Sequence, residues 1–147
     1  MPTEHRNAPP NSAPLWRRLA AILYDSLIVT ALLMVAMALL LPFNRGEAFA
    51  AGTIWVQLYL LGVGTGFFVL FWKLAGQTAG MRAWNLRLVH ENPECTPGTS
   101  ALLVRALMAI ISWAALGLGF FWCLVDPHRA AWHDRVSKTR LIFTPRG

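Results

Sequence analysis

Residues 19–41 have the sequence LAAILYDSLIVTALLMVAMALLL, in which Asp25 is the only charged residue. A helix needs about 20 predominantly apolar residues to cross the hydrocarbon layer of a membrane. The run follows a pair of arginines, which are typical of the cytoplasmic edge of a spanning helix, and Pro42 ends it. The sequence therefore predicts a membrane helix over about residues 16–41.

A second apolar run, residues 54–72, has the sequence IWVQLYLLGVGTGFFVLFW and contains no charged residue. Trp55 and Trp72 lie near its two ends, as the aromatic belts of membrane helices do. We expect a second spanning helix here. Gly62 and Gly66 lie four positions apart, a spacing that lets helix backbones approach closely in lipid. They are candidate helix-packing residues, and glycine without a packing role is the alternative.

A cleaved secretory signal is a competing interpretation of the first run, because Ala48, Phe49 and Ala50 resemble a cleavage site. The apolar stretch before this site is about twice the usual length of a signal core, and Asp25 interrupts it. We therefore expect the first helix to remain part of the protein.

The composition favours lipid rather than water or nucleic acid as the surroundings of this chain. Hydrophobic residues make up 56% of its 147 residues and charged residues 14%, against about 25% charged residues in soluble domains. The net charge of +6 comes from Lys and Arg beside the apolar runs, where they meet anionic headgroups. No basic stripe has the context of a nucleic-acid reader. Cys95 lies in a polar loop and Cys123 in an apolar run, so we expect no disulfide framework.

A third apolar segment, residues 101–125, raises a question of topology. Three full crossings would place the basic C-terminal tail outside, against the usual cytoplasmic bias of Lys and Arg. A bend within residues 112–119 would instead return the chain as a short re-entrant hairpin. The tail is then cytoplasmic, and the strand-like segments 86–89 and 140–143 are free to pair. The charge pattern favours the hairpin, with three crossings as the alternative.

The charged residues within the apolar segments are the candidate functional network. Asp25 follows Arg18 by seven positions, so both project from one helix face roughly 10 Å apart. A carboxylate in the membrane interior is unfavourable by about 2.5–3.5 kcal/mol and needs a partner. Arg105, about one turn inside the third segment, can grip it with two hydrogen bonds. We predict an Asp25–Arg105 pair that extends to Arg18, with either a structural or a transport role.

No catalytic residue, metal ligand or cofactor site is predicted. His128 and His133 have a spacing compatible with metal, but no third ligand accompanies them. We expect His133 and Asp134 to form a helix cap or a surface ion pair. The glycine-containing stretch 76–80 lacks the lysine and the strand-to-helix context of a phosphate loop.

Three motifs in order along residues 14–143 resemble the RDD family of small bacterial membrane proteins. They are Arg18-x-x-Ala21-x-x-x-Asp25, then Gly76-Gln77-Thr78-Ala79-Gly80 before Leu86-Arg87-Leu88-Val89, and finally Asp126-Pro127 through Trp132-His133-Asp134 to Thr139. The resemblance implies that Arg18, Asp25 and Asp134 occupy the positions for which the family is named, with Asp126 as the alternative for the last. It implies a transport-related role, with cation/proton exchange proposed for some members.

These observations predict an all-α membrane protein. It has two transmembrane helices, a third, broken apolar helical segment and a small cytoplasmic β element. We expect a disordered tail over residues 1–14, the membrane domain over 15–143 and a short tail over 144–147. We expect the protein to be located in a bacterial cytoplasmic membrane, which it crosses more than once, with its N-terminus on the cytoplasmic side. Its expected partners are the lipid bilayer and either further copies or a larger membrane complex, and the alternative to transport is an accessory subunit.

Overall fold

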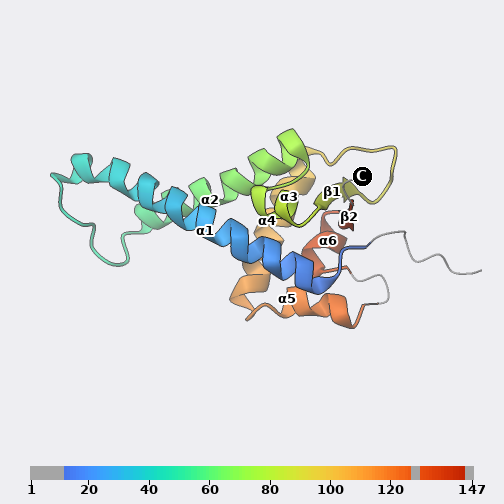
Figure 1. Ribbon diagram of the computed structural model, residues 1–147. Coiled ribbons are helices and arrows are strands. Elements are labelled where there is room, and N and C mark those ends of the chain that lie inside the picture. Colours follow the sequence, from blue (N-terminus) through green and yellow to red (C-terminus); the bar gives the residue numbers. More distant parts are fainter. Residues whose placement is uncertain (1–11, 127–129, 145–147) are drawn as a thin grey trace, which may run out of the picture.

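Two long helices dominate the computed structural model, which describes residues 12–126 and 130–144. Helix α1 (Leu15–Leu40) continues into the 3-10 helix η1 (Leu41–Asn44), and a loop leads to α2 (Ile54–Ala75). Figure 1 shows the two helices running side by side in opposite directions. At 1.5 Å per residue they are about 39 and 33 Å long, enough to cross a hydrocarbon layer of about 30 Å.

The apolar side chains of these helices are largely left uncovered by the rest of the protein. Only 6% of the most apolar window of α1 and 11% of that of α2 are buried. Leu23, Leu27 and Met34, for example, are each at least two-thirds exposed. The core helix of a soluble protein would be mostly covered, so these helices fit a lipid environment.

The third apolar segment is broken. Helix α4 (Thr99–Ala114) ends where Leu116 and Gly117 take positive φ angles of 56° and 78°. The short helices α5 (Leu118–Phe121) and η2 (Trp122–Leu124) follow. At about 24 Å, α4 is shorter than the hydrocarbon layer is thick. The break falls inside the predicted bend region, residues 112–119, because an αL residue ends a helix and redirects the chain.

A two-stranded antiparallel sheet shows that the third segment leaves from and returns to one end of the molecule. Strand β1 (Leu86–His90) precedes α4, and β2 (Thr139–Phe143) follows η2. They pair in a register that places Leu88 opposite Leu141. The predicted pairing of these two segments is therefore present.

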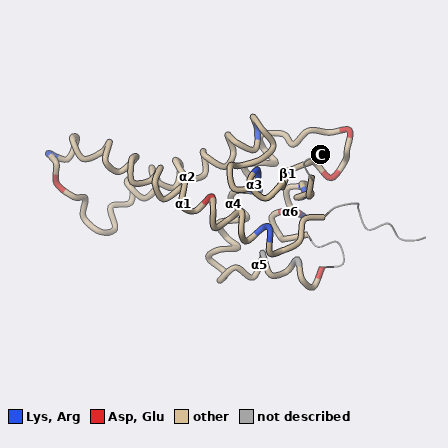
Figure 2. The backbone as a smooth tube through the Cα atoms, viewed as in Figure 1, with Lys and Arg blue, Asp and Glu red and all other residues tan. Residues whose placement is uncertain are grey.

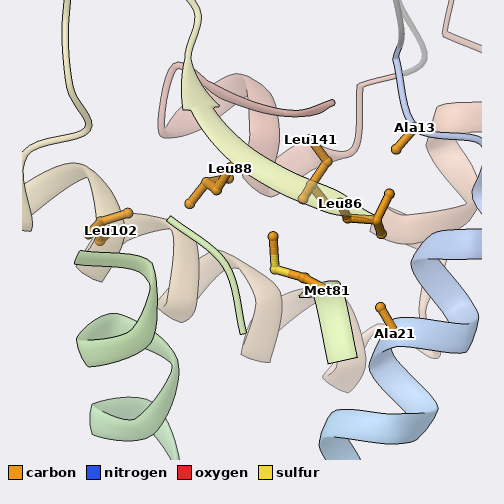
Figure 3. Packing of buried hydrophobic residues seen from close by; sticks show 7 residues of the cluster. All are labelled: Ala13, Ala21, Met81, Leu86, Leu88, Leu102 and Leu141. Carbon is orange, nitrogen blue, oxygen red and sulfur yellow. The ribbon is translucent and has the colours of Figure 1, made fainter. Parts of the chain in front are cut away.

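The hydrophobic core lies at this end of the molecule, around the sheet. Leu86, Leu88 and Leu141 of the strands pack with Met81 of helix α3 (Ala79–Ala83) and with Ala21 of α1 (Figure 3). Helix α6 (Trp132–Val136) contacts both α4 and β2. The sheet end is thus a small packed unit to which the long α1–α2 hairpin is attached.

The predicted N-terminal tail is too long by at least two residues. Ala13 is buried and donates its backbone N–H to the Leu141 carbonyl oxygen at 3.1 Å, and Ser12 forms a bridge with Ile142. At the other end, the Thr144 N–H donates to the Asn85 carbonyl. The expected disorder of residues 1–11, and the tail residues 145–147, lie outside the described residues.

Charge is distributed unevenly along the molecule. The turn between α1 and α2 holds Arg45 and Glu47. Figure 2 shows the remaining basic segments of the described chain toward the end that carries the sheet. The fold therefore has one weakly charged end and one end that carries most of the charged residues, among which Lys and Arg outnumber Asp and Glu.

Candidate functional site

Asp134 lies at the centre of a buried charge cluster. Its carboxylate accepts a hydrogen bond from Arg18 Nη1 at 2.6 Å on Oδ2 and one from Arg105 Nη1 at 2.5 Å on Oδ1. The side chains of Asp134, Arg105 and Arg18 are 1%, 3% and 6% exposed, so both ion pairs are shielded from water. Charge-assisted bonds of this kind are among the strongest in proteins.

Four elements converge to build the cluster. Arg18 comes from α1, Arg105 from α4 and Asp134 from α6, while Thr139 at the start of β2 accepts a second bond from Arg105 Nη1 at 2.9 Å. Arg18 Nε also donates to the Ala13 carbonyl at 3.1 Å. Asp134 Oδ2 caps its own helix by accepting the Ala131 N–H at 3.1 Å. The cluster therefore ties both ends of the described chain to the third apolar segment.

The electrostatic balance of the cluster keeps Asp134 ionised and His133 neutral. Burial alone raises the pKa of Asp134, but the charges of Arg105 and Arg18 outweigh it, and the pKa lies well below its usual range. Burial lowers the pKa of His133 to about 3, and Arg105 contributes further. Among the described residues, Asp134 is thus held by the charges of two guanidinium groups.

Asp25 forms a second, separate centre on α1. It is 3% exposed, and its Oδ2 accepts a hydrogen bond from the Thr78 hydroxyl. Its Oδ1 accepts the Gly80 backbone N–H at 2.8 Å. Thr78 also caps α3 by accepting the Met81 N–H at 3.2 Å. The carboxylate therefore attaches α3 to α1 through neutral donors.

Gly80 makes this attachment sterically feasible. A Cβ atom at this position would lie 2.8 Å from Asp25 Cγ and would collide with the Ala21 carbonyl oxygen. The backbone of α3 approaches α1 this closely only because residue 80 has no side chain.

The predicted Asp25–Arg105 pair is wrong. Among the described residues, the ion-pair partner of Arg105 is Asp134, and the hydrogen-bond donors to Asp25 are Thr78 and Gly80. The physical reason is that α3 covers Asp25 on α1, whereas α6 packs against α4 and brings Asp134 to Arg105. Arg18 does join Arg105, as expected, but through Asp134 rather than through Asp25.

His133 and Asp134 do not form the predicted surface pair. They are 4% and 2% exposed, because α6 is enclosed between α4 and the sheet. The capping role expected for this pair is present at Asp134. His128, which we considered beside His133 as a metal ligand, lies outside the described residues.

Asp126, the alternative to Asp134 as a family position, has a different environment. It is buried, and it accepts hydrogen bonds from the half-exposed Arg135 side chain and from the Ala130 N–H at 2.9 Å. These contacts attach Asp126 to α6 and to Ala130 before it, and they involve neither Arg18 nor Arg105.

The glycines of α2 differ in their surroundings. Cβ atoms built on Gly62 and Gly66 would meet nothing within 4 Å, whereas one on Gly64 would lie 4.0 Å from a Val29 methyl group on α1. Within the described chain, the α1–α2 contact therefore uses Gly64. Packing through Gly62 and Gly66 stays a prediction about a second chain.

Three residues have roles in these centres that their place in the sequence did not predict. The hydroxyl of Thr78 donates to Asp25, and the hydroxyl of Thr139 accepts a hydrogen bond from Arg105. The guanidinium carbon of Arg105 lies 5.2 Å from the centre of a Trp72 ring. No local spacing relates Thr78 to Asp25 or Thr139 to Arg105. For Asp134, the available signal was its place as the third residue of the RDD motif.

A cavity of about 530 Å³ lies between α1, α2 and α4. Its walls are mostly apolar, and Asp25, Arg18 and Arg105 also line it. Both polar centres therefore border the same space.

Comparison with family models gives a match to the RDD family over residues 12–138. The chain belongs to the RDD family. The match includes Arg18, Asp25 and Asp134, and it confirms the resemblance seen in the three sequence motifs. Together with the two uncovered apolar helices, it indicates that this RDD chain is a membrane protein. A comparison with curated proteins finds no match, and a comparison with solved structures finds none either.

Proposed function

We propose that this RDD protein moves protons or monovalent cations across the membrane and that Asp25 is the group that binds and releases them. One observation carries the proposal. Asp25 is a carboxylate on a membrane helix, it borders the cavity, and among the described residues its hydrogen-bond donors are neutral. A carboxylate with no permanent cationic partner is suited to exchange a proton or a cation.

Asp134 is the less suitable carrier. Two arginines hold it, so its charge is compensated at all times and release of a proton or cation has no role there. In the proposal the Arg18–Asp134–Arg105 cluster is the rigid frame, and Asp25 is the exchanging group. The proposed function is not enzymatic and uses no cofactor.

The proposed setting is a bacterial cytoplasmic membrane that α1 and α2 cross, with the N-terminus and the sheet on the cytoplasmic side. Residues 101–125 enter as a re-entrant segment and return. The pairing of β1 with β2 supports this topology, as do the basic residues gathered at the sheet end. A reporter active only in the cytoplasm and fused to the C-terminus should be active, whereas an inactive fusion would indicate three crossings.

Ion flux into proteoliposomes of the pure full-length protein tests the proposal. We expect flux above that of protein-free liposomes, and a loss of at least about tenfold in Asp25→Asn, which retains the shape of the side chain but removes its charge. Glu47→Gln is the matched control, because it removes a carboxylate from the exposed turn. Absence of flux, or equal flux in both variants, would exclude the proposal.

The second candidate is an accessory subunit, and the open surface at Gly62 and Gly66 favours it. Two long helices enclose no pathway alone, so transport itself requires further copies of the chain. The mass of the complex in mild detergent separates the two candidates. A homo-oligomer supports transport, while co-purification with a different membrane protein and an absence of flux supports the accessory role.

A further inference from the structure

The cavity between the helices is elongated, and its lining is mostly apolar. Leu15 and Leu33 both line it and lie eighteen positions apart on α1, a distance of about 27 Å along the helix axis. Leu60 and Phe68 of α2 and Ile110 of α4 also line it. A volume of about 530 Å³ is within the range of ligand sites. Its length and its lining suit a hydrocarbon chain rather than a compact polar solute.

Two side chains that line the cavity, Arg105 and Trp72, each carry a hydrogen-bond donor without an acceptor among the described residues. Arg105 is 97% buried, and its Nε has no hydrogen-bond partner, although its Nη1 binds Asp134 and Thr139. The indole Nε1 of Trp72 is also buried without a partner. Both side chains line the cavity. Buried donors of this kind normally have a partner, and a charged donor without one is especially unfavourable.

The location of these donors indicates what they bind. Trp72 is near the end of α2, where tryptophans of membrane helices meet lipid headgroups. Arg105 carries a permanent positive charge, and its Nε has no acceptor among the described residues, so an anionic oxygen would be attracted. In the proposed topology both donors would lie at the headgroup level, and the apolar lining of the cavity extends from them along α1 and α2.

We infer that the cavity binds a single-chain anionic amphiphile. Its hydrocarbon chain lies between α1 and α2, and its anionic oxygen accepts hydrogen bonds from Arg105 Nε and Trp72 Nε1. A lipid phosphate and a fatty-acid carboxylate both supply this chemistry. Asp25 borders the same cavity, but the inference rests on the donors of Arg105 and Trp72 and does not require the proposed transport.

Three probes with the same chain and different headgroups test the inference. They are oleoyl lysophosphatidylglycerol, oleate and uncharged monoolein, each titrated into the full-length protein in mild detergent and counted by native mass spectrometry. We expect one bound molecule, with at least one anionic probe bound about tenfold more tightly than monoolein. Tighter binding of the phosphate probe indicates a lipid, and tighter binding of oleate indicates a fatty acid. Monoolein binding as tight as that of both anionic probes would overturn the inference.

Two pairs of variants locate the site without changing a charge. Trp72→Phe retains an aromatic ring beside Arg105 but removes the indole N–H donor. The affinity for the anionic probe should fall about tenfold, because one hydrogen bond to a charged group is lost. Its control is Trp55→Phe, at an exposed tryptophan outside the cavity. Ala109→Phe fills part of the cavity and should lower the affinity for all three probes. Ala31→Phe, at an exposed position of α1, should leave these affinities unchanged. Equal affinities within either pair would overturn the inference.

Discussion

Arg18 and Asp134 are 116 positions apart in the chain, yet Arg18 Nη1 and Asp134 Oδ2 lie 2.6 Å apart in the protein interior. This contact joins the first helix to the last, and Arg105 attaches the third apolar segment to the same carboxylate. Asp134 therefore holds together three elements that the hydrophobic runs alone would leave free to separate.

Replacing Asp134 with Asn should destabilise the protein by about 3–5 kcal/mol, because two buried guanidinium groups lose their compensating charge. Thermal unfolding of the purified protein in detergent measures the change. Glu94→Gln, which removes an exposed carboxylate, is the control and should stay within about 0.5 kcal/mol of the wild type. Equal stability of the two variants would contradict a central role for Asp134.

Stability should decrease as the pH is lowered from about 6.5 to about 3. The pKa of His133 is lowered to about 3 in the folded protein from an ordinary value of 6.5, so the unfolded chain binds the extra proton in this window. The pKa of Asp134 is also lowered in the folded protein. Its contribution to the stability is therefore present at pH values above its ordinary pKa and is lost in stronger acid. His133 should contribute up to about 1.4 kcal/mol per pH unit.

The pH dependence of the unfolding temperature checks this prediction. His133→Gln should reduce the slope between pH 6.5 and 4, whereas His90→Gln, at a partly exposed position on β1, should retain it. An unchanged slope in the first variant would mean that His133 titrates normally in the folded protein.

Gly80→Ala should destabilise the contact between α1 and α3 by about 1–3 kcal/mol, because the new methyl group overlaps Asp25 and the Ala21 carbonyl. Gly62→Ala is the control, since its methyl group meets open space inside a helix, where Ala is preferred to Gly. Unfolding temperatures in detergent should therefore fall in the first variant and be maintained or rise in the second. A fall of the same size in both would place the strain elsewhere.

Thr78→Val should also weaken the attachment of α3, by about 1–3 kcal/mol, because a buried carboxylate oxygen and the Met81 N–H both lose their partner. Thr53→Val removes a local, exposed bond to the Ala50 carbonyl and should change stability much less. Hydrogen exchange at residues 79–83 gives a local readout. Unaltered protection there in Thr78→Val would show that Asp25 holds α3 without this hydroxyl.

The extent of the elements was predictable from the sequence because it depends on neighbouring residues. The uninterrupted apolar runs at 19–41 and 54–72 require helices, since a backbone in lipid must satisfy its own hydrogen bonds. The glycine and turn signals near Gly117 place the break in the third segment. The strand-like pattern over residues 86–89 predicts a strand, and the structure contains β1 at Leu86–His90.

The partners of the buried charges were decided only by the tertiary structure. Asp25 and Arg18 share a helix, and their spacing suggested one network, but α3 covers Asp25 while α6 brings Asp134 to Arg18 and Arg105. Which charges meet depends on how short segments far apart in the chain pack together. Periodicity and composition indicate whether each segment is more stable in lipid or in water. They contain no information about the distance between two side chains on different segments.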